Sequence, residues 1–184
     1  FKPAFEMELD AMRSVKYDYG LDNLQLMVPF CRTPEEGSLV TGLLNEKGVG
    51  PASGTDLFVM VELPSNVIEA DRFIEMMDLS GGSIGSNDLV QTVYAVSRDD
   101  LEGYQNPIDA RSPSVKAMIR DIVGKFNSKG MEIGICGQAP SDFPDEFPAF
   151  LVDCGITSIS VTPDTAVAVL SLIHISEPTR RLNI

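Results

Sequence analysis

The feature that most constrains the fold of this chain is a set of five short apolar runs, each followed by polar residues capable of chemistry. The runs cover residues 24–30, 57–61, 82–85, 132–135 and 156–161. Continuous apolar runs are typical of strands that are buried on both faces, as in a parallel sheet. Because the reactive groups of a β/α barrel gather where its strands end, the pattern predicts a site at the carboxyl ends of these strands.

Helical segments are predicted between the runs, which is the alternation expected of β/α units. The clearest helix start is at 33–36, where a capping threonine precedes a proline, and glutamate follows three residues after the cap. The other helices are predicted over 1–19, from Ser65 or Asn66 to 77, from Asn87 or Asp88 to about 95, over 112–130, and over 145–154. The longest irregular stretch is 97–111. Five strands are fewer than the eight of a closed barrel, so the predicted fold is α/β, a partial (β/α)8 TIM barrel.

The net charge limits the classes of partner, and the cysteine content indicates the cellular compartment. The formal net charge is −13, which disfavours nucleic acid and anionic membrane surfaces because both require a basic face. An anionic substrate would need a bound cation or local arginines to offset this charge. Three cysteines without zinc-type spacing predict a reduced, cytoplasmic protein. No apolar stretch reaches transmembrane length, and no signal peptide is visible.

Two acids follow predicted strands and form a candidate metal site. Glu62 ends the run 57–61, and Asp88 follows the run 82–85. Two carboxylates, completed by water and substrate oxygens, are a usual way of holding Mg²⁺. The alternatives are a salt-bridged Glu62 and a helix-capping Asp88. The residues between them, Gly85, Ser86 and Asn87, could present backbone N–H groups to an anion, although so short a motif is weak evidence.

Cys136 is the candidate proton carrier. It follows the run 132–135 and lies between Gly134 and Gly137, which permit close approach of backbone or ligand. A thiol with a suitably tuned pKa can move a proton at a carbon next to a carbonyl, whereas the alternative is a buried, inert cysteine. Cys31 and Cys154 are interpreted as structural residues.

The ordered segments MVPFCRT, MVELPSN, GSIGSNDLVQ, IGICGQAPSD and ISVTPDT resemble the PEP-binding barrel of the PEP-utilising enzymes. The resemblance covers the chain to about residue 169. The pieces PF-x-RT, E-x-PSN and GICGQ-x-PSD are most similar to the branch that makes phosphoenolpyruvate from pyruvate, ATP and water. They are less similar to pyruvate phosphate dikinase and to the sugar-transport enzyme I. The resemblance implies about the last five βα units of the barrel.

The resemblance also implies roles for individual residues. Glu62 and Asp88 would ligate Mg²⁺, and Cys136 would exchange a proton with the methylene or methyl carbon of the substrate. The phosphoryl group would pass between a phosphohistidine and the enolate oxygen. The residues that would contact bound pyruvate or PEP are Glu62, Gly85, Ser86, Asn87 and Asp88.

Further parts of such an enzyme are implied but do not occur in this sequence. They are a swivelling phosphohistidine domain, an ATP-grasp domain, and the early-strand arginines that clamp the PEP phosphate. A homo-oligomer is also implied. The chain by itself is therefore expected to be inactive. Two other hypotheses remain: a Mg²⁺-dependent keto-acid lyase or aldolase barrel, and a non-catalytic binding homologue.

The segment LSLIHISEPTR, at 170–180, resembles an in-frame translation of a sequencing-library adapter. We therefore interpret 1–169 as the C-terminal part of the barrel and 170–184 as a tail without biological origin. An amphipathic terminal helix is the alternative. His174 is the single histidine of the chain, so on this interpretation no mechanism uses it.

Overall fold

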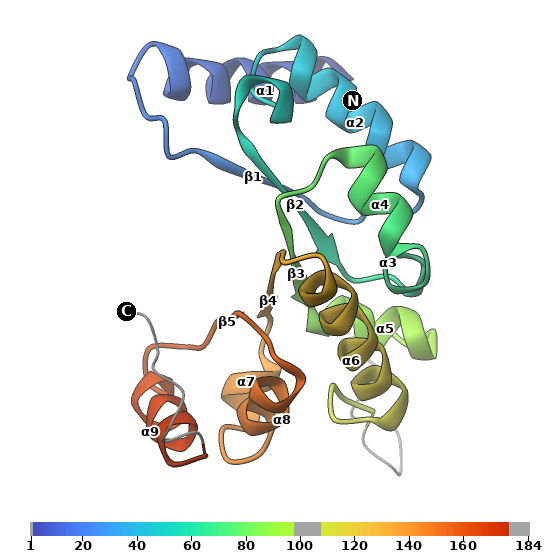
Figure 1. The fold of residues 1–184 in the computed structure, drawn as a ribbon, viewed down its shortest axis with the longest axis vertical. Helices are drawn as coiled ribbons and strands as arrows, with labels where there is room; N and C mark the ends of the chain where they lie inside the picture. The colour runs from blue at the N-terminus through green and yellow to red at the C-terminus, as the bar shows by residue number, and fades with distance from the viewer. Residues whose placement is uncertain (1, 98–107, 177–184) are drawn as a thin grey trace.

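A computed structural model describes residues 2–97 and 108–176, which form one parallel sheet with helices between its strands. The strand order is β1-β2-β3-β4-β5, and every neighbouring pair is parallel. The strands follow one another through the molecule in chain order (Figure 1). Their bounds are β1 (Gln25–Val28), β2 (Asp56–Val61), β3 (Gly81–Gly85), β4 (Glu132–Cys136) and β5 (Ser158–Ile159).

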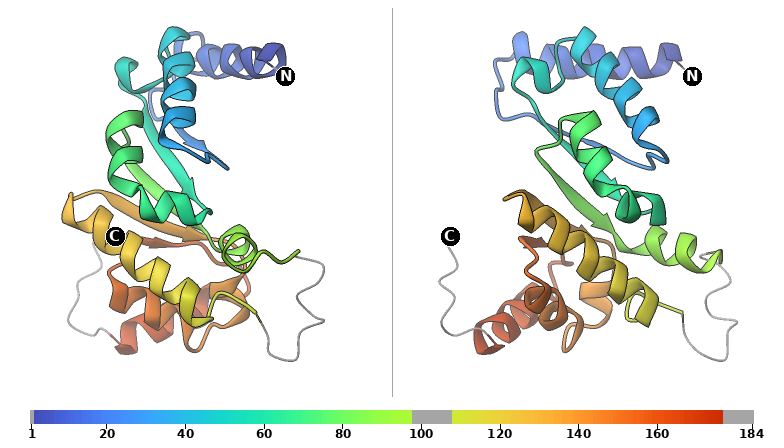
Figure 2. Two further views of the ribbon diagram at one scale, coloured as in Figure 1. Left: turned by 90° about the vertical axis from the view of Figure 1, so that its right-hand side faces the viewer. Right: turned by 45° about the vertical axis from the view of Figure 1, so that its right-hand side comes forward.

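Helices α2, α4 and α6 lie on one side of the sheet, and a view onto that side shows them in front of it (Figure 2, left). Helices α8 and α9 pack together near β5. The helical bounds are α1 (Lys2–Tyr17), α2 (Pro34–Glu46), η1 (Pro51–Ser53), α3 (Pro64–Ile68), α4 (Ala70–Met77), α5 (Ser86–Tyr94), α6 (Pro113–Ser128), α7 (Ala139–Asp142), α8 (Phe147–Cys154) and α9 (Ala166–Ser176).

The hydrophobic core lies between the sheet and these helices. Alternate strand residues such as Val59, Ile84 and Ile133 are buried, and the large side chains of Phe73 and Phe126 fill the same core. The prediction that every run is buried on both faces is wrong for β1, β2 and β5, and no residue of the run 156–161 is fully buried. In β1 and β2 burial alternates along the strand, and Met27 is 42% exposed. Helices cover one face, whereas the other face is the barrel interior, which five strands cannot enclose.

The sheet is open, because β1 and β5 are its two edges within the described residues. A closed barrel would join its first and last strands by hydrogen bonds. This arrangement confirms the predicted fold class, a partial β/α barrel. The strand order equals the chain order because each strand–helix–strand connection places the next strand beside the previous one.

Some predicted helix starts are confirmed and others are wrong. The Thr33 hydroxyl caps α2 by accepting from the Glu36 N–H at 3.1 Å. Asn87 and Asp88 do not cap α5, because that helix already begins at Ser86, directly after β3. The helix predicted from Ser65 or Asn66 to 77 is divided into α3 and α4, and α3 begins at Pro64.

Later elements follow the predictions more closely. Helix α6 begins after Ser112, and α8 ends at Cys154 before a left-handed Gly155 (φ 87°), although α8 begins at Phe147 rather than at 145. Helix α7 was not predicted, and β5 is shorter than the run 156–161.

The predicted tail falls partly in a helix, since residues 170–176 continue α9. The His174 side chain and residues 177–184 lie outside the described part of the chain, as does most of the predicted loop, 98–107. The adapter interpretation concerns the gene and stays a prediction. Within the described ranges, no helix combines the length and apolar character needed to cross a membrane.

Candidate functional site

A pocket of about 110 Å³ lies where β2, β3 and β4 end. The structure brings all six predicted site residues to this one pocket, although they come from segments up to 74 positions apart, at 62, 85–88 and 136. Two further residues line it, Met60 and Gly137. The complete lining is Met60, Glu62, Gly85, Ser86, Asn87, Asp88, Cys136 and Gly137.

The junction of β3 with α5 forms the centre of the pocket. Gly85 ends β3 and Ser86 begins α5, so no loop separates strand from helix. A Cβ at Gly85 would lie 2.8 Å from Glu62 Oε2, and only glycine therefore leaves room for that carboxylate. The Ser86 side chain is fully buried and donates to the Cys136 carbonyl at 3.0 Å, which ties the end of β3 to the end of β4.

Glu62 is a buried carboxylate without a cationic partner. It is 4% exposed, and its Oε1 accepts from the Phe30 N–H at 2.5 Å. Burial raises the pKa of Glu62 above its ordinary value of 4.5; the Phe30 amide lowers this pKa in part, and the charge of Asp88 raises it further. Among the ion pairs of the described residues, none involves Glu62 or Asp88. The alternative of a salt-bridged Glu62 is therefore wrong for this part of the chain.

Asp88 lies in the first turn of α5, where a negative charge is favoured by the helix dipole. Its Oδ1 accepts from Gln91 Nε2 at 3.2 Å. The predicted alternative, a capping role, is wrong because Gly85 is the residue before the helix. Two uncompensated carboxylates in one pocket create a local excess of negative charge that a cation would relieve.

The donor set fits Mg²⁺ as an open site. Within the ranges 2–97 and 108–176, no three His, Cys, Asp or Glu side chains gather as a closed metal cage. Mg²⁺ does not need one, because it commonly takes one or two carboxylates and completes its octahedral shell with water and substrate oxygens. Glu62 and Asp88 supply that minimum from two neighbouring strand ends.

Cys136 faces the same pocket from the end of β4, and its Sγ lies 3.5 Å from Met60 Sδ. The flanking glycines do permit close approach, but of side-chain hydroxyls rather than of the backbone or ligand that was predicted. A Cβ at Gly137 (φ 109°) would overlap Ser86 Oγ, and one at Gly134 would overlap Ser158 Oγ. Sequence reasoning missed Met60, although side chains two positions apart along an extended chain point the same way, and Met60 lies two residues before Glu62.

The other two cysteines, and Arg32 beside one of them, do not line this pocket. Cys31 is buried, and its burial raises the pKa of the thiol to about 11, which fits the structural role predicted for it. Cys154 is half-buried in α8, and burial also raises the pKa of its thiol. Arg32 forms an ion pair with Glu36 at 3.2 Å and does not line the pocket.

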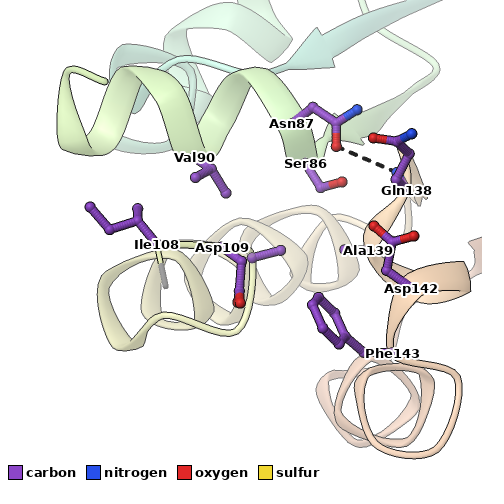
Figure 3. A pocket seen from close by; sticks show the side chains of 10 residues that line it. Ser86, Asn87, Val90, Ile108, Asp109, Gln138, Ala139, Asp142 and Phe143 are labelled. Carbon is purple, nitrogen blue, oxygen red and sulfur yellow. Dashed lines mark hydrogen bonds between the residues drawn. The ribbon is translucent and has the colours of Figure 1, made fainter. Parts of the chain in front are cut away.

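A second pocket, of about 130 Å³, adjoins the first and shares Ser86 and Asn87 with it (Figure 3). It lies between the start of α5, the residues before α6, and α7. Asn87 Oδ1 accepts from the Gln138 N–H at 3.4 Å, the contact dashed in Figure 3. Asn87 therefore stands at the boundary of the two pockets, with its amide oxygen directed towards the residues that follow β4.

The environment of Glu62 predicts a pH-dependent stability in the absence of metal. As pH rises above 4.5, the unfolded chain releases a proton that folded Glu62, with its raised pKa, still holds. The folded state therefore loses stability until the pH has passed the raised pKa. We expect Glu62→Gln to exceed the wild type in urea-unfolding midpoint at pH 8, and the difference to vanish below about pH 4.

The exposed carboxylate of Glu75 in α4 provides a matched control. Glu75→Gln should follow the wild-type midpoint across the same pH range. If Glu62→Gln is less stable than the wild type at pH 8 and the difference does not depend on pH, the burial of an ionised Glu62 is not destabilising and this account is wrong.

Comparison with solved structures defines the class of fold. The chain is similar to malate synthase of Haloferax volcanii, with a TM-score of 0.63 and 12% identity, covering 89% of this chain and 46% of that one. It is also similar to an HpcH/HpaI aldolase/citrate lyase family protein of Burkholderia cenocepacia, with a TM-score of 0.54 and 14% identity, covering 87% and 67%. These proteins have barrel-type folds of the aldolase and lyase kind, and at this identity the likeness concerns the fold alone.

Sequence comparison defines the family. Residues 2–177 match the PEP-utilising enzyme, PEP-binding domain family, and the chain belongs to it. Phosphoenolpyruvate synthase of Aquifex aeolicus is 46% identical over 166 residues, which cover 90% of this chain and 19% of the relative. The same-named proteins of Synechocystis and Escherichia coli are 44% and 38% identical, covering 90% and 91% of this chain. The chain spans about a fifth of the length of these relatives.

Proposed function

We propose that this chain supplies the pyruvate and PEP site of a phosphoenolpyruvate synthase, which converts pyruvate, ATP and water to phosphoenolpyruvate, AMP and phosphate. The observation that carries the proposal is the convergence of Glu62, Asp88 and Cys136 on one pocket. A pair of carboxylates suited to Mg²⁺ beside a thiol is what enolisation of a keto acid requires.

Each group has a distinct task in this proposal. Glu62 and Asp88 hold Mg²⁺, which when bound acts as a Lewis acid towards the substrate oxygen. Cys136 removes a proton from the methyl carbon of pyruvate, or returns it to the methylene carbon of the enol. The backbone N–H groups at the start of α5, with Gly85, Ser86 and Asn87, orient the anionic substrate near the positive end of the helix dipole.

The phosphoryl step needs groups that these 184 residues do not supply. We propose that a phosphohistidine domain and an ATP-grasp domain act together with this site, that the assembly is a homo-oligomer, and that it works in the cytoplasm. The chain alone should therefore show no pyruvate, water dikinase turnover. Turnover by the isolated polypeptide would contradict this division of labour.

Other functions have less support. Pyruvate phosphate dikinase and the sugar-transport enzyme I belong to the same family and would use the same pocket, but the relatives with 38–46% identity are named phosphoenolpyruvate synthase. A keto-acid lyase rests on fold likeness at 12–14% identity. A non-catalytic homologue would have no need to keep Glu62, Asp88 and Cys136 in one pocket.

Metal-dependent ligand binding tests the proposal. We expect the chain to bind oxalate, a planar mimic of the enolate, only in the presence of Mg²⁺ or Mn²⁺, as measured by calorimetry. Glu62→Gln or Asp88→Asn should each remove this binding, because each deletes a charged ligand. Asp142→Asn is the control, because Asp142 lies in α7 and lines only the neighbouring pocket. Oxalate binding that persists without metal, or in both ligand variants, would refute the proposed site.

A further inference from the structure

We propose that Asn66 is a positioning residue that fixes the direction of the Glu62 carboxylate, an inference that rests on the proposed function for its catalytic meaning. Asn66 lies in α3 outside the pocket lining and is 2% exposed. The three hydrogen bonds of its side chain are all made to backbone groups. Oδ1 accepts from the N–H groups of Glu62 at 3.2 Å and Leu63 at 3.0 Å, and Nδ2 donates to the Cys31 carbonyl at 2.7 Å.

These bonds join the turns that follow two adjacent strands. Cys31 lies in the turn after β1, and Glu62 is the first residue after β2. The register between the two strands ends at Val28 and Val59, so the strand ladder does not hold the turns together. The Asn66 amide replaces that ladder beyond the ends of the strands, since it donates to one turn and accepts from the other.

The turn after β1 needs such support because Phe30 has a positive φ of 53°. This left-handed conformation is disfavoured for residues other than glycine and persists only where surrounding contacts maintain it. In this conformation the Phe30 N–H points at Glu62 Oε1, at 2.5 Å. The hydrogen bond from Asn66 Nδ2 to the adjacent Cys31 carbonyl therefore holds the turn in the geometry that brings the Phe30 N–H to Glu62.

The two Glu62 oxygens are thereby distinguished. Oε1 is engaged by Phe30, whereas Oε2 faces Gly85 at the pocket, where an added Cβ would be 2.8 Å away. One oxygen is thus held by the protein, and the other is directed to where a cation would bind. Loss of Asn66 would release the β1 turn, remove the Phe30 donor and allow the carboxylate to rotate. Removal of a group that orients a metal ligand in this way typically weakens metal binding about 10–100-fold.

The test compares Asn66→Ala with Asn45→Ala in this chain. Asn45 is the matched control, because its Oδ1 also clamps a backbone N–H, that of Ala52 at 3.0 Å, but beside η1 and away from the pocket. The first readout is the Phe30 amide signal in metal-free protein labelled with ¹⁵N-phenylalanine, assigned from its loss in Phe30→Leu. The second is Mn²⁺ affinity measured by electron paramagnetic resonance.

We expect Asn66→Ala to shift the Phe30 amide proton upfield and to weaken Mn²⁺ binding about 10–100-fold, whereas Asn45→Ala leaves both unchanged. If Asn66→Ala does not fold, Asn66→Asp applies the same test, because it keeps the acceptors and loses the donor to Cys31. An unchanged Phe30 signal, or equal effects of both asparagine variants, would overturn the inference. If Asn66→Ala shifts the Phe30 signal but the wild-type chain binds no Mn²⁺, the positioning role is upheld and the proposed function is refuted instead.

Discussion

Replacing Cys136 with alanine in the full-length enzyme to which we assign this chain is expected to lower turnover about 10²–10⁴-fold, the usual contribution of a positioned acid or base. Among the described residues that line the pocket, the thiol is the one acidic side chain apart from the two carboxylates proposed to hold the metal. Because we propose that those carboxylates bind Mg²⁺, the variant should bind Mg²⁺ and oxalate as the wild type does. The expected defect is therefore in the chemical step alone.

Exchange of the pyruvate methyl protons with D₂O, followed by NMR, measures this step without the phosphoryl transfer. Cys154→Ala is the control, because it removes a half-buried thiol from α8, outside the pocket. The control should keep both exchange and turnover. Turnover by Cys136→Ala equal to that of the wild type would show that another group moves the proton.

Gly137→Ala is expected to have a second large effect, on both stability and the site. Gly137 has a φ of 109°, which is strained for any residue with a Cβ, and its Cβ would overlap the Ser86 hydroxyl. Displacing Ser86, which is fully buried, would break its bond to the Cys136 carbonyl. Backbone strain of this kind costs about 1–3 kcal/mol, and an unpaired buried hydroxyl costs about 1–3 kcal/mol more.

Gly130→Ala separates the two contributions. Gly130 also has a positive φ, of 69°, but no atom lies within 4 Å of the position its Cβ would take. We expect Gly130→Ala to lose only the strain energy, and Gly137→Ala to lose about twice as much in urea unfolding and to lose oxalate binding as well. Equal losses for the two variants would mean that the Ser86 side chain moves aside without cost. The hydrogen bond from Ser86 to the Cys136 carbonyl, which joins the ends of β3 and β4, would then contribute little to stability.

The site was predictable from sequence because of one geometric fact. Parallel strands that neighbour one another end at the same edge of a sheet, so residues that end separate runs must converge. Glu62, Asp88 and Cys136 follow this rule, and the pocket contains all three. The position of Met60 also follows from strand alternation, but a methionine in an apolar run carries no polar signal to distinguish it from the core.

The remaining features depend on contacts between segments that are distant in the sequence, and the spacing of apolar residues does not reveal such contacts. Asn66 was predicted only as one of two possible starts of a helix, the position where asparagine usually acts as a cap. Asn66 does accept from the Leu63 N–H before α3, but it also donates to the Cys31 carbonyl in the turn after β1, a contact with a distant segment that no local pattern reveals. The burial prediction failed at Met27 for a related reason. An apolar run shows that a strand favours burial. It does not show whether the chain supplies side chains to cover both of the strand's faces.

The pocket takes its lining from β2, β3 and β4 and the residues that directly follow them, and each of these strands is hydrogen-bonded on both sides within the described sheet. The marginal strands β1 and β5 contribute no residue to that lining. The residues proposed to carry the proton chemistry therefore stand on strands that are paired with a neighbour on each side, and the turn after β1 reaches them only through the Phe30 N–H.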